Sequence, residues 1–155
     1  MNSKIFKKLY KKNFKNKETA LIFENKKISF LQLISKSKIV AENLSRKNNL
    51  LKTRVIVALE NSEKYVYLLI AASKLNLSLI LVSPDIKNND LNKIKKNARL
   101  IIVDKKNLKN YKFFFKKMAF FSIEDLIKKN DKKIKKLANL KKDDFIINFS
   151  SGSTG

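Results

Sequence analysis

The hydrophobic residues of this chain gather in short runs that are separated by amphipathic stretches. Near the amino terminus, Ala20–Phe23 and Ile28–Phe30 flank a polar tetrapeptide and predict two strands joined by a turn. Three further apolar runs lie at Val55–Leu59, Leu77–Val82 and Leu100–Val103. Continuous apolar runs of this length are typical of parallel strands that are covered on both faces. The three runs are therefore predicted to be buried strands.

The intervening stretches carry apolar residues at helical spacing. Ser29, with Gln32 three residues later, has the pattern of a capping box and predicts the start of a helix that docks on a sheet. The apolar face of this helix comprises Phe30, Leu33, Ile34, Val40, Ala41 and Leu44. Asn61 and Ser62 are candidate caps of a second helix. Its predicted inner face comprises Val66, Leu69, Ile70 and Ser73. A third helix is predicted to begin near residue 88, with apolar positions at Leu91, Ile94 and Ala98.

The order strand, helix, strand, helix, strand predicts an α/β fold with a parallel sheet and helices on the sheet faces. Pro84 cannot continue a central strand, so the strand before it is expected to end at Val82. With 155 residues the chain has the size of one domain. We expect one folded unit over residues 19–155, preceded by a basic segment over residues 1–18.

The second half of the chain is less regular. Phe113–Phe115 and Met118–Phe121 are candidates for a short strand, and Ser122–Lys129 is a candidate for a short helix. The lysine-rich segment Asp131–Lys142 is expected to be an exposed loop. Phe145–Phe149 is again apolar and predicts a last strand.

Composition narrows the possible chemistry. The absence of cysteine and histidine removes thiol and imidazole nucleophiles, disulfides and the metal sites that such ligands form, so no metal site is predicted. The formal net charge of +23 suits a polyanionic partner. However, the only arginines are Arg46, Arg54 and Arg99, and arginine is favoured where bases and phosphates are bound by a planar fork. Lysine recurs beside asparagine, which favours tolerant surface positions over a specific nucleic-acid site. Attraction to an anionic partner and binding to a membrane surface are the alternatives.

The sequence predicts neither a secretory signal nor a transmembrane segment. Met1–Glu18 carries lysines throughout and no long apolar run, so we expect a cytoplasmic protein. Tyr65–Val82 is long and apolar enough to be weighed as a membrane span. Its centre contains Ser73, Lys74 and Asn76, and a lysine at mid-bilayer costs about 2.5–3.5 kcal/mol. A helix followed by a strand accounts for the same residues without that cost.

Both glycines of the chain lie in its last four residues. Average glycine usage of about 7% corresponds to about eleven glycines in a chain of this length, so the two that remain indicate a special backbone requirement. The hydroxyl- and glycine-rich tail comprises Ser150, Ser151, Gly152, Ser153, Thr154 and Gly155. Small residues let backbone N–H groups converge on phosphate oxygens, and the hydroxyls add donors. The tail therefore predicts a phosphate-binding loop, although its spacing is that of neither the Walker loop nor the dinucleotide turn. A flexible Ser/Gly linker is the alternative.

The segment Phe149–Gly155 resembles the signature Tyr-Ser/Thr-Ser-Gly-Ser/Thr-Thr-Gly of adenylate-forming enzymes, which include acyl-CoA synthetases, luciferases and the adenylation domains of peptide synthetases. Further segments that resemble the family before this signature are Thr19–Ile22, Ile28–Leu33, Val55–Ser62, Leu77–Pro84 and Leu100–Asp104. Two turns depart from the family pattern. Lys52-Thr53 replaces Gly-Asp, and Leu75-Asn76-Leu77 replaces Ala-Gly-Ala, so both turns are expected to be loosened.

The resemblance implies an incomplete N-terminal part of the adenylate-forming fold. It implies ATP and Mg²⁺ as cofactors, a carboxylic acid as substrate, and CoA or the pantetheine of a carrier protein as the thiol that receives the acyl group. Residues Ser150–Gly155 would bind the ATP phosphates, and no catalytic residue is expected within the chain. Because the signature continues in the family beyond the position of Gly155, the chain alone is expected to be inactive.

Two alternatives to this interpretation stay open at the level of sequence. The chain could be a small basic module that binds nucleic acid, or a noncatalytic α/β module. Neither the carboxylic acid, the thiol acceptor nor the oligomeric state follows from the residues.

Overall fold

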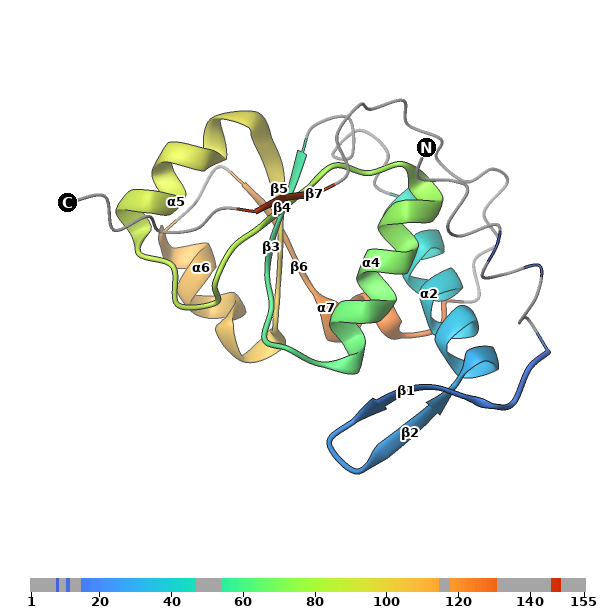
Figure 1. Ribbon diagram of the computed structural model, residues 1–155. Coiled ribbons are helices and arrows are strands. Elements are labelled where there is room, and N and C mark those ends of the chain that lie inside the picture. Colours follow the sequence, from blue (N-terminus) through green and yellow to red (C-terminus); the bar gives the residue numbers. More distant parts are fainter. Residues whose placement is uncertain are drawn as a thin grey trace.

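A parallel sheet flanked by two layers of helices forms the centre of the molecule (Figure 1). The computed structural model describes residues 8, 11, 15–46, 54–114, 118–130 and 146–148. The five strands of the sheet lie in the order β6 (Ala119–Ser122), β5 (Ala98–Val103), β3 (Arg54–Ala58), β4 (Leu79–Leu81) and β7 (Ile146–Asn148). All four neighbouring pairs are parallel, which confirms the predicted α/β fold.

Helices cover both faces of this sheet (Figure 1). The helices on one face are α2 (Phe30–Ser45), α4 (Glu63–Leu75) and α7 (Ile123–Ile127). The opposite face carries α5 (Asn88–Ile94) and α6 (Leu108–Phe114), together with the 3₁₀ turns η1 (Lys95–Asn97) and η2 (Lys105–Asn107). In the part of the chain that the structure describes, none of the helices has the length and apolar character needed to cross a bilayer.

The central strand β3 is buried on both faces because its side chains alternate between the two helical layers. Val55 and Val57 belong to the core under α2, α4 and α7. Ile56 and Ala58 belong to the core under α5 and α6. Full burial of one such aliphatic side chain contributes about 1.5–3 kcal/mol, so this strand anchors both layers. The apolar run in the sequence is therefore a buried strand, as predicted.

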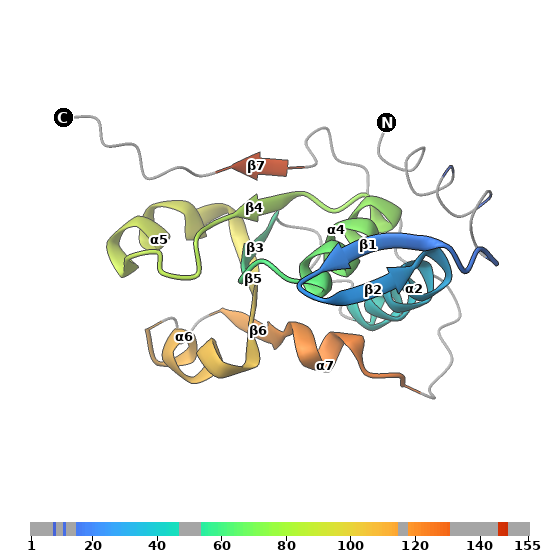
Figure 2. The same cartoon turned by 60° about the horizontal axis from the view of Figure 1, so that its bottom comes forward.

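An antiparallel hairpin of β1 (Thr19–Phe23) and β2 (Lys26–Ser29) precedes the first long helix and lies beside it (Figure 2). The predicted capping box is present. The Gln32 N–H donates to the Ser29 hydroxyl at 3.2 Å, and the Ser29 N–H donates to Gln32 Oε1 at 2.9 Å. Because Ser29 caps the helix, Phe30 begins α2 and does not extend the hairpin. Helix α2 packs on α4, α7 and the hairpin, so it belongs to the helical layer on that face of the sheet.

The buried face of α4 differs from the predicted one. The buried residues of this helix are Tyr67, Leu68, Ala71, Ala72, Ser73 and Leu75. Val66, Leu69 and Ile70 were expected on the inner face but are only partly buried against the core. Ser73, the fourth residue of the predicted face, is buried as expected, so the buried face overlaps the predicted one but is centred on Leu68, Ala71, Ala72 and Leu75. Ser62 is the N-cap, as predicted, with its hydroxyl accepting from the Tyr65 N–H at 3.4 Å.

The turn between α4 and β4 is well formed, so the expectation of a loosened turn is wrong here. Asn76 adopts φ 54° and ψ 43°, the left-handed conformation that usually requires glycine. Its N–H donates to the carbonyl groups of Ala72 and Ser73, and the Leu77 N–H donates to the Ala72 carbonyl at 3.0 Å. Asparagine tolerates this conformation better than other residues with a Cβ. The second departing turn, at residues 52–53, lies outside the described residues.

Two boundaries on the α5–α6 side also differ from the predictions. Ala98 begins β5 instead of continuing the preceding helix, and its side chain packs in the core under α5 and α6. Residues 113–114 end helix α6 and do not form a strand. Leu108 and Tyr111, three residues apart, both pack inward, which a helix permits and a strand does not.

The remaining predictions for the second half agree with the structure where it is described. Strand β6 overlaps the predicted strand but extends one residue further, to Ser122, and helix α7 lies within the predicted helix. Ser122 caps α7 by accepting the Asp125 N–H at 3.1 Å. The predicted last strand is present as β7 over residues 146–148. The expected loop over residues 131–142 lies outside the described residues.

Candidate functional site

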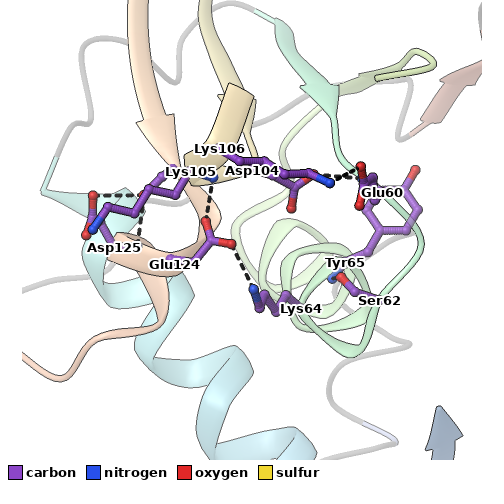
Figure 3. Close-up of polar contacts among 10 residues, drawn as sticks. Glu60, Ser62, Lys64, Tyr65, Asp104, Lys105, Lys106, Glu124 and Asp125 are labelled. Carbon is purple, nitrogen blue, oxygen red and sulfur yellow. Dashed lines mark hydrogen bonds and ion pairs between the residues drawn. The ribbon is translucent and has the colours of Figure 1, made fainter. Parts of the chain in front are cut away.

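The parallel strands all end on the same side of the molecule, which we call the carboxyl end of the sheet. Ligands of open α/β sheets bind in crevices outside the carboxyl ends of the strands. Acidic residues lie within two residues of the ends of three of the strands. Glu60 follows β3, Asp104 follows β5, and Glu124 follows β6 (Figure 3).

Asp104 joins the ends of two neighbouring strands. Its side chain is only 7% exposed, and its Oδ2 accepts the backbone N–H of Glu60 at 2.9 Å. Burial raises the pKa of Asp104 because it disfavours the charged carboxylate, and the hydrogen bond from Glu60 offsets part of this shift. Glu60 in turn pairs with the ammonium group of Lys106. The carboxyl ends of β3 and β5 are thereby held together.

Glu124 of α7 links helix α4 and the 3₁₀ turn η2 at the same end of the sheet. Its Oε1 accepts from Lys64 Nζ at 2.8 Å, and its Oε2 accepts the backbone N–H of Lys105 at 2.9 Å. Partial burial alone would raise the pKa of Glu124, but the hydrogen bonds from Lys64 and Lys105 outweigh it, so the pKa is lowered. The hydrogen bond between Lys64 and Glu124 also raises the pKa of Lys64. Both oxygens of this carboxylate are therefore occupied by protein donors.

This network braces the strand ends and leaves its carboxylates engaged. Within the described ranges, no group of three or more histidine, cysteine, aspartate or glutamate residues could hold a metal ion. Glu60, Asp104 and Glu124 each accept or pair with groups of the protein itself. The three carboxylates thus link the segments that follow β3, β5 and β6 to one another and to α4.

The predicted phosphate loop follows β7 in the sequence. Strand β4 pairs with β7 in parallel over its three residues, and Leu81 lies opposite Asn148. The carboxyl end of β7 therefore lies at the carboxyl end of the sheet, next to that of β4. Ser150–Gly155, all six predicted site residues, lie outside the described residues. What the structure places is the strand that leads into them.

The segment after β4 is fixed by a contact that sequence reasoning missed. The Tyr111 hydroxyl donates to the carbonyl oxygen of Pro84 at 2.9 Å. Burial raises the pKa of Tyr111 to about 12, with the charges of Asp85 and Asp104 adding to the effect. Tyr111 lies 27 residues from Pro84 in sequence, so no local pattern could have revealed the pair. Asp104 could have been noticed, because it is the polar residue that ends a buried apolar run.

Both the sequence and the fold of the chain can be compared with those of known proteins. The sequence profile of a family described as AMP-binding enzyme matches residues 10–155. No curated protein sequence matches the chain significantly.

Several solved structures share the fold. O-succinylbenzoate coenzyme A synthetase (MenE) from Bacillus subtilis in complex with AMP superposes with a TM-score of 0.76 at 19% identity, over 97% of this chain and 39% of that chain. The N-terminal subdomain of NpsA from Klebsiella oxytoca in complex with 3-hydroxyanthranilyl-AMSN has a TM-score of 0.72 at 22% identity, over 99% and 38%. A second MenE structure, in complex with ATP and magnesium ion, has a TM-score of 0.68 at 18% identity, over 83% and 34%. The chain thus spans about 34–39% of the length of these structures.

Proposed function

The chain belongs to the AMP-binding enzyme family, and from this membership we propose that it is the N-terminal part of an enzyme that activates a carboxylic acid with ATP. The product of this step would be an acyl-adenylate, with pyrophosphate released. The folded N-terminal part would occupy residues 19–155 behind the basic segment 1–18. An enzyme that consumes ATP works where ATP is made, so we propose the cytoplasm as its location.

The observation that carries this proposal is the position of β7. The strand pairs with β4 in parallel and ends at the carboxyl end of the sheet, and Ser150 follows Asn148 by two residues in the sequence. A strand that ends at this side and leads into a Ser/Gly-rich tail supports a phosphate loop there. The donors available in Ser150–Gly155 are backbone N–H groups and four hydroxyls, and they suit phosphate oxygens.

The chemistry assigned to this loop is electrostatic. A substrate carboxylate attacks the α-phosphorus of ATP, an oxygen–phosphorus bond forms, and the bond to the β-phosphate breaks as pyrophosphate leaves. Negative charge grows on the leaving group, so donors from Ser150–Gly155 to the β- and γ-phosphates lower the barrier. Mg²⁺ would enter with the phosphates of ATP and neutralise part of the same charge. The substrate carboxylate is already ionised, so no general base is required.

A second step would transfer the acyl group from the adenylate to a thiol. We propose CoA or the pantetheine of a carrier protein as the acceptor, with AMP as the leaving group. The names of two structures with the same fold, a coenzyme A synthetase and an adenylation protein fused to a carrier domain, support these two acceptors equally.

The test is binding of Mg-ATP to the chain, measured by isothermal titration. We expect Gly152→Val and Thr154→Ala to weaken binding at least about tenfold, because a Cβ at residue 152 blocks close approach of N–H groups and residue 154 loses a donor. Ser35→Ala is the matched control, since Ser35 is an exposed hydroxyl on α2. Equal affinity in all three variants, or no binding by the unmodified chain, would contradict the proposal. Protein that includes the sequence following Gly155 can be tested in the same way for ATP–pyrophosphate exchange.

A further inference from the structure

Phe113 is the most exposed large hydrophobic residue in the described part of the chain. It lies in the last turn of α6 and is 74% exposed. The helix packs on the sheet through Leu108 and Tyr111, so the core does not need Phe113. An aromatic side chain in water forgoes the free energy that its burial would contribute.

Exposed lysines lie near Phe113 along the same segment of the chain. Lys109 lies one helical turn before Phe113 on the same side of α6, and Lys112 is its neighbour in sequence. Both lysine side chains are exposed. Lys105 precedes the helix and is also exposed, whereas Lys106 is paired with Glu60. No acidic residue occurs between residues 105 and 114.

We propose that the exposed side of α6, formed by Lys109, Lys112 and Phe113, docks on an anionic lipid surface. Phenylalanine and lysine are among the residues with which peripheral helices bind at the boundary of headgroups and acyl chains. Phe113 would insert at this boundary, and the two lysines would contact lipid phosphates. The net charge of +23 would attract the chain to the surface from a distance.

The same surface fits single-stranded RNA less well. Proteins that bind single strands offer several aromatic platforms on which successive bases stack, often with arginine. Along α6 the other aromatic residue whose side chain the structure describes, Tyr111, is 8% exposed and directed into the core. One exposed aromatic ring beside two exposed lysines matches insertion into a membrane surface better than a series of stacked bases.

The first experiment measures binding of the 155-residue chain to sedimented vesicles. One vesicle preparation contains phosphatidylglycerol and phosphatidylcholine, and the other contains phosphatidylcholine alone, both at 150 mM salt. Phe113→Ser should reduce the partition coefficient on anionic vesicles about tenfold. Ile22→Ser is the matched control, because Ile22 is 65% exposed but lies on the hairpin. It should change the partition coefficient less than about twofold. Failure of the unmodified chain to bind, or equal effects of the two variants, overturns the proposal.

A second pair of variants separates local from overall charge. Lys109→Gln with Lys112→Gln and Lys36→Gln with Lys38→Gln remove the same net charge, the latter pair being exposed on α2. One lysine at an anionic surface strengthens binding about fivefold, so the α6 pair should lose about 25-fold and the α2 pair less than about threefold. Equal losses would mean attraction by diffuse charge and would overturn the proposal. Tighter binding to single-stranded RNA than to anionic vesicles at the same salt would overturn it as well.

A spectroscopic measurement guards against effects on folding. The chain contains no tryptophan, so Phe113→Trp places the only tryptophan at the proposed contact, where it can be excited selectively over the four tyrosines. Its emission should shift to shorter wavelength with anionic vesicles, and that of Ile22→Trp should not. An unshifted spectrum of Phe113→Trp would contradict insertion of residue 113.

Discussion

Tyr111 connects α6 to the segment that follows β4 through one buried hydrogen bond. Its hydroxyl donates to the Pro84 carbonyl at 2.9 Å, and the side chain is 8% exposed. Removal of the hydroxyl leaves that carbonyl without this donor in a buried setting, and a typical net loss is about 1 kcal/mol. We expect Tyr111→Phe to lower the free energy of unfolding by about this amount in urea denaturation.

Tyr67 provides the control for this variant. It is 7% exposed, lies on α4 on the opposite face of the sheet, and loses the same atom in Tyr67→Phe. The described residues provide its hydroxyl with no hydrogen bond of the kind that Tyr111 makes. The effect of Tyr67→Phe should be less than half that of Tyr111→Phe. Similar losses in the two variants would attribute the effect to a general change in the core and would contradict the assigned bond.

Asp104 gives a prediction about pH. Burial raises its pKa in the folded chain above the value in the unfolded chain, so the folded state holds the proton more tightly. The unfolded state then binds fewer protons in the interval between the two values, and stability falls as pH rises through that interval. Asp104→Asn keeps an oxygen that can accept the Glu60 N–H but cannot ionise. The stability of Asp104→Asn relative to the unmodified chain should therefore increase from pH 4 to pH 7.

The difference between the two proteins isolates Asp104 from its neighbours. Glu124 and Asp125 have lowered pKa values, and their contribution is lost as pH falls, but it is present in both proteins. Urea denaturation at several pH values measures the difference directly. A stability difference that is constant with pH, or that moves in favour of the aspartate as pH rises, would contradict the burial effect.

Among the secondary-structure elements, the C-terminus of α4 depends on one backbone conformation. Asn76 holds φ 54°, which costs a residue with an ordinary side chain about 1–2 kcal/mol. Asn76→Ala should therefore destabilise the chain by about 1 kcal/mol, whereas Asn76→Gly should be neutral or slightly stabilising. Thermal unfolding of both variants checks this order. A glycine variant as unstable as the alanine variant would mean that the asparagine side chain, and not the conformation, supports the turn.

The elements that the sequence predicts well are those with a strong local signal. The apolar run at Val55–Leu59 and the capping box at Ser29 with Gln32 specify a buried strand and a helix start from neighbouring residues alone. The buried face of α4 and the helix over residues 108–114 depend on packing against distant elements. Three consecutive phenylalanines suit a strand as well as a helix, and contact of Tyr111 with the sheet decides between them.

The candidate site likewise has one part that the sequence can reveal and one part that it cannot. A phosphate loop is contiguous in sequence, so its glycines and hydroxyls can be recognised without a structure. Its prediction over Ser150–Gly155 remains a prediction, since these residues lie outside the described part. The brace at the carboxyl end of the sheet joins Lys64 to Glu124 across 60 residues and Glu60 to Asp104 across 44. Pairs of this kind exist only after the sheet has formed.

For the molecule as a whole, the net charge of +23 makes a prediction that separates general attraction from recognition. Lysines that contact phosphates release counterions, so attraction of this kind weakens steeply with salt. We expect the chain to bind DNA and RNA at 50 mM salt without sequence preference and to lose about a thousandfold in affinity by 200 mM. Fluorescence anisotropy with two unrelated oligonucleotides at several salt concentrations measures both properties.

The control for charge is a set of lysine-to-glutamine pairs on different elements. If charge alone acts, removal of Lys36 and Lys38 on α2 and removal of Lys26 and Lys27 on β2 should reduce oligonucleotide affinity equally, because all four side chains are exposed and each pair releases the same number of counterions. Binding that prefers one sequence and survives about 200 mM salt would instead identify a nucleic-acid site. Such a result would favour the basic binding module over the ATP-dependent enzyme, because the phosphate loop explains no preference between base sequences.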